Sequence, residues 1–354
     1  SIEESWAYVS GGPSVRLKYI PLKPKMESVV MPPVPYSPQS IDRLNASFKS
    51  PAGNQQIRSS HERHWLGTDG LGRDVLAGLI HGSRLALMIG FLSVFLAMLT
   101  GVLLGAAAGF YGDRGIRIHR ITLFFAIIGL LGLVYGLYLA IDGGVSSPTV
   151  FTTLLFFIGL TLVYLGVRKS SKIYFNGTTA GAGIYLPLDL IILRVVEIFR
   201  SIPALFILLA LIALLDRPGV MQISLILALL MWPSFARYTR AEFLSLREKE
   251  FVSAGRLLRK TDGQLIFSEI LPNARAPLVV LAAFGVSAAI LAEATLSFLG
   301  LGLAIDQVSW GSMLNEARKY FRAWWLAVFP GLALFFVIYS MNALGDYFEV
   351  KKTI

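Results

Sequence analysis

The chain has 354 residues, of which 55% are hydrophobic and 15% charged, and its 32 Lys and Arg against 22 Asp and Glu give a net charge of +10. Because an average soluble domain has about 25% charged residues, this composition excludes a disordered chain and argues against an ordinary soluble globule. The absence of cysteine excludes disulfides, thiol nucleophiles and thiolate metal sites, and the basic excess of so apolar a chain is typical of cytoplasmic loops rather than of nucleic-acid binding.

The first 64 residues differ from the rest of the chain because they hold eight of its sixteen prolines. Prolines at this density block the interiors of helices and sheets. We therefore expect a loop-rich extracytoplasmic segment. His61 and His64 lie three residues apart within it. In such a segment a solvated pair is favoured over a metal site, and no metal ligands are predicted.

The next stretch, HWLGTDGLGRDVLAGLIHGSR, predicts a short amphipathic helix at the membrane interface. Thr68 or Asp69 is suited to cap a helix that begins near Leu71. Its apolar face would consist of Val75, Leu76, Leu79 and Ile80.

Long uncharged stretches dominate the remainder, and the first, between Arg84 and Asp113, has 28 residues. A bilayer core about 30 Å thick requires about 20 apolar residues in a helix. Continuous runs of this kind exclude the alternating pattern of a barrel. We predict an all-α polytopic membrane protein with seven spans, at about 85–110, 121–141, 150–167, 188–215, 220–237, 276–301 and 324–345.

Lys and Arg gather in alternate loops, which sets the expected orientation. They concentrate after the first span, after the third span, in the loop between the fifth and sixth spans, and at Lys351 and Lys352. We assign these segments and the C-terminus to the cytoplasm and residues 1–66 to the outside.

The first span carries Gly101, Gly105 and Gly109, a doubled small-xxx-small pattern. Small residues at this spacing let two helices approach closely in a membrane. We interpret these glycines as a helix-packing stripe.

The loop 238–275 is predicted to form a helix, a turn and a second helix. Phe251, Ala254, Leu257 and Leu258 share one helix face, and Thr261 with Gln264 makes a capping box. The second helix would run from Leu265 to Leu271 and stop at Pro272. The exposed apolar face of the first helix suits either a lipid surface or a groove on a partner protein, and the pattern alone does not separate the two.

Two further observations concern mechanism. No G-x-x-x-x-G-K-[ST] motif is present, so this chain has no P-loop of its own, and no catalytic or cofactor-binding residues are predicted. Glu293 stands alone with 17 uncharged residues before it and 12 after it. A structural hydrogen bond between helices is the favoured explanation. A proton- or ion-coupled transporter using Glu293 is the alternative function, and a membrane assembly factor is a third.

Three blocks of sequence resemble one known family. HWLGTDGLGRDVLAGLIHGSRLALMIG, EFVSAGRLLRKTDGQLIFSEILPNARAPL and EATLSFLGLGLAIDQVSWGSMLNEARKYFRAWWLAVFPGLA are similar to the DppC/OppC-type permeases of bacterial ABC importers for peptides and nickel. The likeness covers about residues 65–115 and 185–350. It implies a type I importer permease of the inner membrane, acting by alternating access on oligopeptides or dipeptides.

The resemblance also implies the partners: a homologous second permease, two ATPase subunits that bind ATP and Mg, and an external solute-binding protein. In the family the loop corresponding to 238–275 docks onto the ATPase. Carried over to this sequence, the coupling residues are Glu250, Phe251, Val252, Ser253, Ala254, Gly255, Leu258, Arg259, Thr261 and Asp262.

Two departures from the family stand out. Arg259 replaces the glycine of the family's EAA loop, so the chain is expected to turn differently there or to extend the helix. In addition, about 70 residues, Ile116 to Tyr185, intervene before the next core span. We expect this insertion to be a hairpin on the outside of the core. The family also has a helix before its outer segment, which implies one before Ser1.

The expected organisation is an outer segment at 1–66, an interfacial helix at 67–84, the first core span and loop at 85–115, the inserted hairpin at 116–185, and the permease core at 186–350 with its coupling loop.

Overall fold

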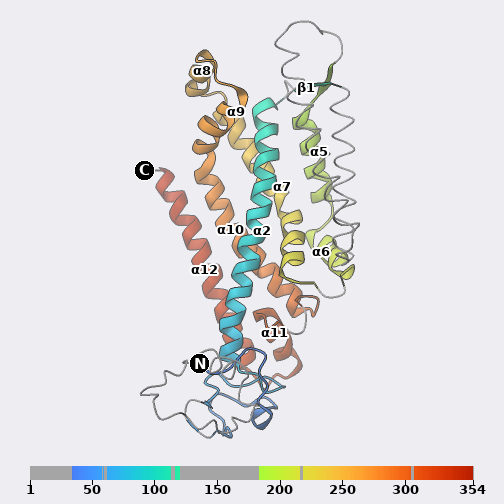
Figure 1. Ribbon diagram of the computed structural model, residues 1–354, viewed down its shortest axis with the longest axis vertical. Helices are drawn as coiled ribbons and strands as arrows, with labels where there is room; N and C mark the ends of the chain where they lie inside the picture. The colour runs from blue at the N-terminus through green and yellow to red at the C-terminus, as the bar shows by residue number, and fades with distance from the viewer. Residues whose placement is uncertain are drawn as a thin grey trace, which may run out of the picture. The chain divides into compact units, whose positions relative to one another are not determined.

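The computed structural model describes residues 34–57, 59, 62–112, 116–119, 183–215, 218–303 and 307–353. Most of them lie in helices (Figure 1). Strands β1 (Ile116–His119) and β2 (Gly183–Leu186) pair antiparallel, with Ile116 opposite Leu186. The predicted spans at 121–141 and 150–167 and the predicted placement of the hairpin lie outside the described residues.

Four helices among the described residues are long and apolar enough to cross a membrane. They are α2 (Val75–Tyr111), α7 (Val220–Leu246), the continuous run Asp262–Phe298 that ends in α10 (Leu271–Phe298), and α12 (Trp325–Thr353), whose candidate span is Trp325–Glu349. These helices confirm the predicted spans at 85–110, 220–237, 276–301 and 324–345.

The stretch predicted as a span at 188–215 is broken rather than one continuous helix. The chain there forms α5 (Leu188–Ser201) and α6 (Ala204–Ala213), which are bent by 79° at the break between them. Ile202 has the extended angles φ −99° and ψ 130°. A proline disfavours helical angles in the residue before it, so Pro203 ends α5 at this point.

The start of α2 also differs from the prediction, because the helix begins at Val75 rather than near Leu71. The carboxylate of Asp74 accepts the Ala77 N–H at 2.7 Å and caps the helix. Asp69 instead accepts the N–H groups of Leu71 and Arg73 in the preceding turn, at 2.9 and 2.8 Å. The predicted interfacial helix and first span are therefore one continuous helix.

The chain divides into two compact units. Unit 1 comprises Ser1–Ala97, Leu208–Met231 and Val279–Ile354, and unit 2 comprises Met98–Ile207 and Trp232–Leu278. One core cluster of unit 1 joins α2, α6, α7 and α10 through the buried side chains Ile89, Leu208, Ile212, Ile223, Leu227, Ala289 and Leu296. The core of unit 2 is built from Ala106, Phe110, Phe243, Val252, Leu265, Ile270, Ala274 and Leu278.

A second cluster of unit 1 holds the proline-rich segment against α11 (Trp310–Lys319) and the start of α12, two helices that pack together. The rings of Phe48 and Tyr320 stack with centroids 4.5 Å apart. The indole N–H of Trp325 donates to the Thr68 carbonyl at 3.1 Å. We call residues 34–74 together with α11 the cap. Its first part is loop-rich, as predicted, with one 3-10 turn at Arg43–Asn45.

His64 is not solvated, which corrects the prediction for this residue. It is fully buried in the cap. Its Nδ1 lies 2.9 Å from Asp74 Oδ1 and its Nε2 lies 3.3 Å from Asp42 Oδ2, while the Tyr36 ring stacks on it at 4.2 Å. The carboxylates come from positions 10 residues after and 22 residues before the histidine, so local spacing gives no sign of them. His61 lies outside the described residues.

Candidate functional site

The loop predicted to face the cytoplasm folds as two short helical segments in unit 2. Helix α8 (Glu250–Leu257) follows the end of α7, and α9 (Asp262–Gln264) begins the second segment. Thr261 Oγ1 accepts the Gln264 N–H at 3.3 Å, and the Gln264 side chain accepts the Thr261 N–H at 2.9 Å. The predicted capping box is therefore confirmed.

The sequence predicted that the second segment would stop at Pro272, and this prediction is wrong. A π-helical stretch, η4 (Leu265–Ile270), runs directly into α10, and Pro272 is the second residue of α10. Pro272 therefore lies inside a continuous helical run, where it lacks the N–H for one intrahelical hydrogen bond, directly after the π-helical stretch. The 238–275 loop is consequently continuous with the apolar helix that follows it.

One face of α8 is anchored in the core of unit 2. Val252 and Gly255 are buried, and a Cβ built on Gly255 would lie 2.7 Å from Leu265 Cδ2. A larger residue at this position would therefore require the Leu265 side chain to shift. Among the predicted coupling residues, Val252 and Gly255 are therefore buried and pack α8 against the core of unit 2, and Phe251 is half-buried.

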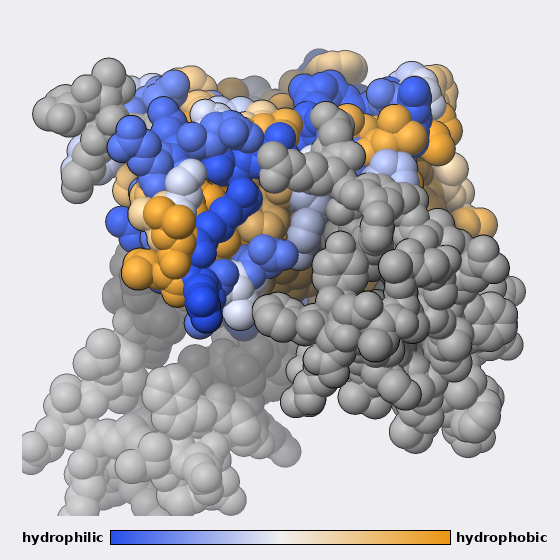
Figure 2. All heavy atoms as spheres, turned by 90° about the horizontal axis from the view of Figure 1, so that it is seen from above, coloured by the Kyte–Doolittle hydropathy of each residue, from blue (hydrophilic) through white to orange (hydrophobic). Residues whose placement is uncertain are grey.

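The opposite face of α8 is exposed (Figure 2). Leu257 and Leu258 at its C-terminal end are 86% and 74% exposed. Figure 2 looks onto α8 and α9 and shows hydrophobic side chains set among hydrophilic ones. The other exposed residues of α8, α9 and the turn between them are Glu250, Ser253, Ala254, Arg256, Arg259, Thr261, Asp262, Gly263 and Gln264.

Arg259 ends α8 in a left-handed conformation, with φ 55°. Its N–H donates to the Arg256 carbonyl at 3.0 Å, and the Lys260 N–H donates to the Gly255 carbonyl at 3.1 Å. This pair of hydrogen bonds is a Schellman motif, whose left-handed position is usually glycine. The expectation that Arg259 would turn differently or extend the helix is wrong, because the arginine adopts the backbone conformation that glycine adopts in this motif. We call Leu257, Leu258 and Arg259 the α8 tip.

Two of the basic residues near the tip are neutralised within the loop. Lys260 forms an ion pair with Glu269, and Arg247 Nε lies 3.1 Å from Glu248. Neither Arg256 nor Arg259 has a carboxylate partner among the residues that the structure describes.

The predicted glycine stripe lies against α7 within unit 2. A Cβ built on Gly105 would lie 2.3 Å from the Ala236 carbonyl oxygen, and one on Gly101 would lie 2.7 Å from the Trp232 carbonyl oxygen. Gly109 comes equally close, 2.7 Å from the Arg240 carbonyl oxygen. Any side chain at these positions would force the two helices apart.

An ion pair that sequence reasoning missed links α5 to α7 next to this stripe. Arg240 binds both carboxylate oxygens of Asp189, with Nη2 2.6 Å from Oδ2. Asp189 is buried. The residues are 51 positions apart, so no helical spacing connects them; the isolated charge of Asp189 at the start of an apolar run was the only available signal.

Glu293 lies in unit 1 and is buried in α10. Its carboxylate accepts the Ser297 hydroxyl at 2.7 Å and also interacts with Ser309, the N-cap of α11. The hydrogen bond to Ser297 lies within α10, and the interaction with Ser309 connects α10 to α11, which agrees with a structural role for this residue.

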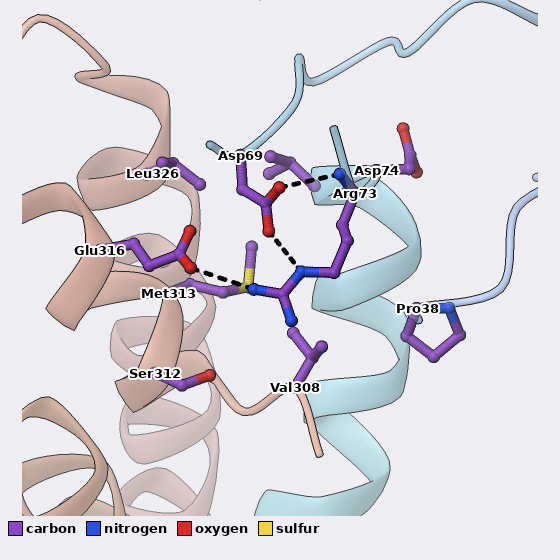
Figure 3. Close-up of a pocket in the computed structure, with 10 residues that line it drawn as sticks. Pro38, Asp69, Arg73, Asp74, Val308, Ser312, Met313, Glu316 and Leu326 are labelled. Carbon is purple, nitrogen blue, oxygen red and sulfur yellow. Dashed lines mark hydrogen bonds and ion pairs between the residues drawn. The ribbon is translucent and has the colours of Figure 1, made fainter. Parts of the chain in front are cut away.

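A pocket in unit 1 is lined by one arginine, Arg73, which already forms ion pairs with two carboxylates (Figure 3). Arg73 Nε lies 2.5 Å from Asp69, and its Nη2 lies 3.0 Å from Glu316. Burial raises the pKa of Glu316, and Asp69 raises it further, against the influence of Arg73. With the guanidinium shared by two carboxylates, the pocket offers no free cation to a ligand.

The family model described as "Binding-protein-dependent transport system inner membrane component" matches residues 175–353, just over half of the chain. The chain belongs to this family. It is therefore a multi-pass membrane permease with the all-α fold of type I ABC importers. The assignment favours the permease function over the ion-coupled alternative.

Relatives support the same family over most of the chain. The Pseudomonas aeruginosa "Di/tripeptide transport system permease protein DppC" is 31% identical over 82% of this chain and 72% of its own length. The Haemophilus influenzae "Dipeptide transport system permease protein DppC" is 27% identical over 98% of this chain and 92% of its own. An inward-facing MetNI methionine ABC transporter has a TM-score of 0.44 at 16% identity, covering 76% of this chain and 93% of that one, a likeness too loose to add to the assignment.

Proposed function

We propose that this permease is the membrane-spanning subunit of an ATP-driven peptide importer, and that the α8 tip docks onto a separate ATPase subunit. The observation that carries the proposal is the exposure of Leu257 and Leu258 on a helix whose other face is seated in the core. Fully burying a leucine side chain stabilises a complex by about 1.5–3 kcal/mol. Two adjacent exposed leucines on a loop predicted to face the cytoplasm therefore support a protein contact.

The packing of α8 suggests how a displacement of this helix is transmitted to the membrane-spanning helices. Val252 and Gly255 contact the core that contains Leu265 and Phe243, and these two residues belong to η4 and α7. Because η4 continues into α10, a displacement of α8 moves the cytoplasmic ends of two spanning helices together. Such a rigid connection suits alternating access, in which ATP closes the ATPase subunits and tilts the spans.

The remaining parts of the proposal follow from the family. The partners are a homologous second permease, two ATPase subunits that bind ATP and Mg, and an external solute-binding protein. The permease lies in the bacterial inner membrane, with residues 1–66 outside and the C-terminus in the cytoplasm. The names of the curated relatives support dipeptides or short oligopeptides as the substrate class.

The test is peptide uptake by proteoliposomes that contain the complete complex. We expect uptake to require ATP on the side of the ATPase subunits and to ignore an imposed proton or sodium gradient. The Glu293→Gln variant keeps the hydrogen-bonding shape of the side chain, and it should retain ATP-driven uptake. Gradient-driven uptake without ATP that Glu293→Gln abolishes would contradict the proposal and restore the ion-coupled alternative.

A further inference from the structure

The α8 tip contains a backbone conformation that its sequence does not favour. Among the described residues, Arg259 is one of three non-glycine residues with positive φ, together with Ser47 and Phe48. Glycine reaches this conformation without steric conflict, whereas a Cβ disfavours it. The Schellman hydrogen bonds of Arg259 use only backbone atoms, so the arginine side chain contributes nothing to them. Local folding therefore does not explain why an arginine occupies this position.

The guanidinium of Arg259 also lacks a counter-charge in the part of the chain that the structure describes. The neighbouring residue Lys260 forms an ion pair with Glu269, so its charge is neutralised within the loop. Arg259 is exposed next to two exposed leucines. Arg256 lies about one helical turn earlier, and it is likewise exposed without a carboxylate partner among the described residues. Strained non-glycine residues persist where a function requires the side chain.

The shape of α8 favours a protein groove over a lipid surface for this tip. A helix that lies on a bilayer presents a long apolar stripe over several turns. Helix α8 has only eight residues, its buried face carries Val252 and Gly255, and the polar Glu250 and Ser253 are exposed beside the leucines. Its apolar contribution is confined to one projecting end, which fits a pocket.

From these observations we infer that Arg259 is a specificity-determining residue, whose guanidinium pairs with a carboxylate on the rim of the ATPase groove that receives Leu257 and Leu258. The inference rests on the proposed coupling function. The ATPase subunit must then have an apolar pocket with a carboxylate at its edge. An ATPase that lacks this carboxylate would bind the permease more weakly, because Arg259 would have no partner. A planar guanidinium suits this role because it binds a carboxylate through two parallel hydrogen bonds.

The test compares Arg259→Gly and Arg259→Gln with Arg322→Gln, which removes the same charge from an exposed position between α11 and α12, outside the 238–275 loop. The permease is held in nanodiscs of neutral phosphatidylcholine, and binding of its cognate ATPase subunits is titrated at low and at high ionic strength. We expect both Arg259 variants to bind about tenfold more weakly at low ionic strength and to lose part of the salt dependence. Arg259→Lys should recover part of the affinity, and Arg322→Gln should bind as the unmodified permease does.

Arg259→Gly separates docking from folding because glycine relieves the backbone strain. The melting temperature of this variant should be equal to or above that of the unmodified permease, even though its docking is weaker. Leu257→Asp serves as the second arm. If Leu257→Asp abolishes docking and Arg259→Gly docks normally, the inference about Arg259 is wrong while the coupling function stands.

Two other results would overturn the inference. Normal docking by both Leu257→Asp and Arg259→Gly would remove the coupling function together with the role of Arg259. If the effect of Arg259→Gly is absent in phosphatidylcholine and arises only in nanodiscs with phosphatidylglycerol, the partner of the guanidinium is a lipid head group rather than a protein carboxylate.

Discussion

The buried and half-buried charges of the cap in unit 1 and the exposed arginines at the end of α8 in unit 2 differ in whether they have partners. In the cap, Arg73 is shared by Asp69 and Glu316, and His64 lies between two aspartates. In the loop, Arg256 and Arg259 are exposed without a carboxylate partner among the described residues. These charges of the cap are paired within the fold, whereas the two arginines lie exposed beside Leu257 and Leu258. The contrast is consistent with a structural role for the first group and a contact with a partner for the second.

The largest effect is expected at the α8 tip. Leu257→Asp places a charge in the proposed apolar pocket and should weaken ATPase docking by at least about 2 kcal/mol, as hot-spot substitutions do. The exposed side chain contributes little to the fold, so the melting temperature of the isolated permease should stay unchanged. Co-purification of the ATPase subunits and peptide uptake measure the effect. A variant that docks and transports normally would show that the leucines are not an interface.

A somewhat smaller effect is expected within unit 2. Gly105→Ala places a Cβ 2.3 Å from the Ala236 carbonyl oxygen and should destabilise the permease by about 1–3 kcal/mol through overpacking. Gly331→Ala is the matched control, because its Cβ meets nothing within 4 Å. Thermal unfolding in detergent should show a loss for the first variant only. Equal melting temperatures would mean that the glycine stripe does not set the approach of α2 to α7.

Arg259→Gly should change stability in the opposite direction. Removing the Cβ from a left-handed position should stabilise α8 by about 1 kcal/mol. Hydrogen exchange of the α8 amides in the isolated permease measures this directly. Faster exchange in the variant would show that the arginine side chain supports the loop rather than a partner.

The cap should show a modest pH dependence. Burial favours the neutral form of Asp42, but hydrogen bonds from Asn45, His64 and the Leu44 N–H outweigh it and hold the pKa of this carboxyl below its ordinary value of 3.8. The ionised carboxylate therefore stabilises the cap above that value, and the contribution is lost as the pH falls through the folded pKa. Limited proteolysis between about pH 5 and about pH 3 should show the cap loosening, and Asp42→Asn should remove that dependence.

The sequence predicts features that depend on neighbouring residues. The four continuous spans are visible as uncharged runs, and the capping box of the loop is visible as a three-residue spacing between Thr261 and Gln264. The break before Pro203 was also readable, because a proline there restricts Ile202, but the uniform hydropathy of the stretch concealed it.

Features that join distant residues were not predictable from one sequence. The Asp189–Arg240 pair spans 51 positions, and the burial of His64 depends on carboxylates from two other stretches of the chain. The conformation of Arg259 is a different case. Glycine is the expected residue at the left-handed position of a Schellman motif. The arginine at position 259 therefore led to the prediction of a different turn, although the backbone forms this motif.

The most direct test of docking by the α8 tip is a cross-link from it to the ATPase. The chain has no native cysteine, so Leu257→Cys and Phe321→Cys introduce single thiols at side chains that are 86% and 88% exposed, the second lying between α11 and α12 in unit 1. In the assembled complex, a short thiol-to-amine cross-linker should join position 257 to an ATPase subunit and leave position 321 unjoined. No adduct from position 257, in a complex that hydrolyses ATP and transports peptide, would contradict the account.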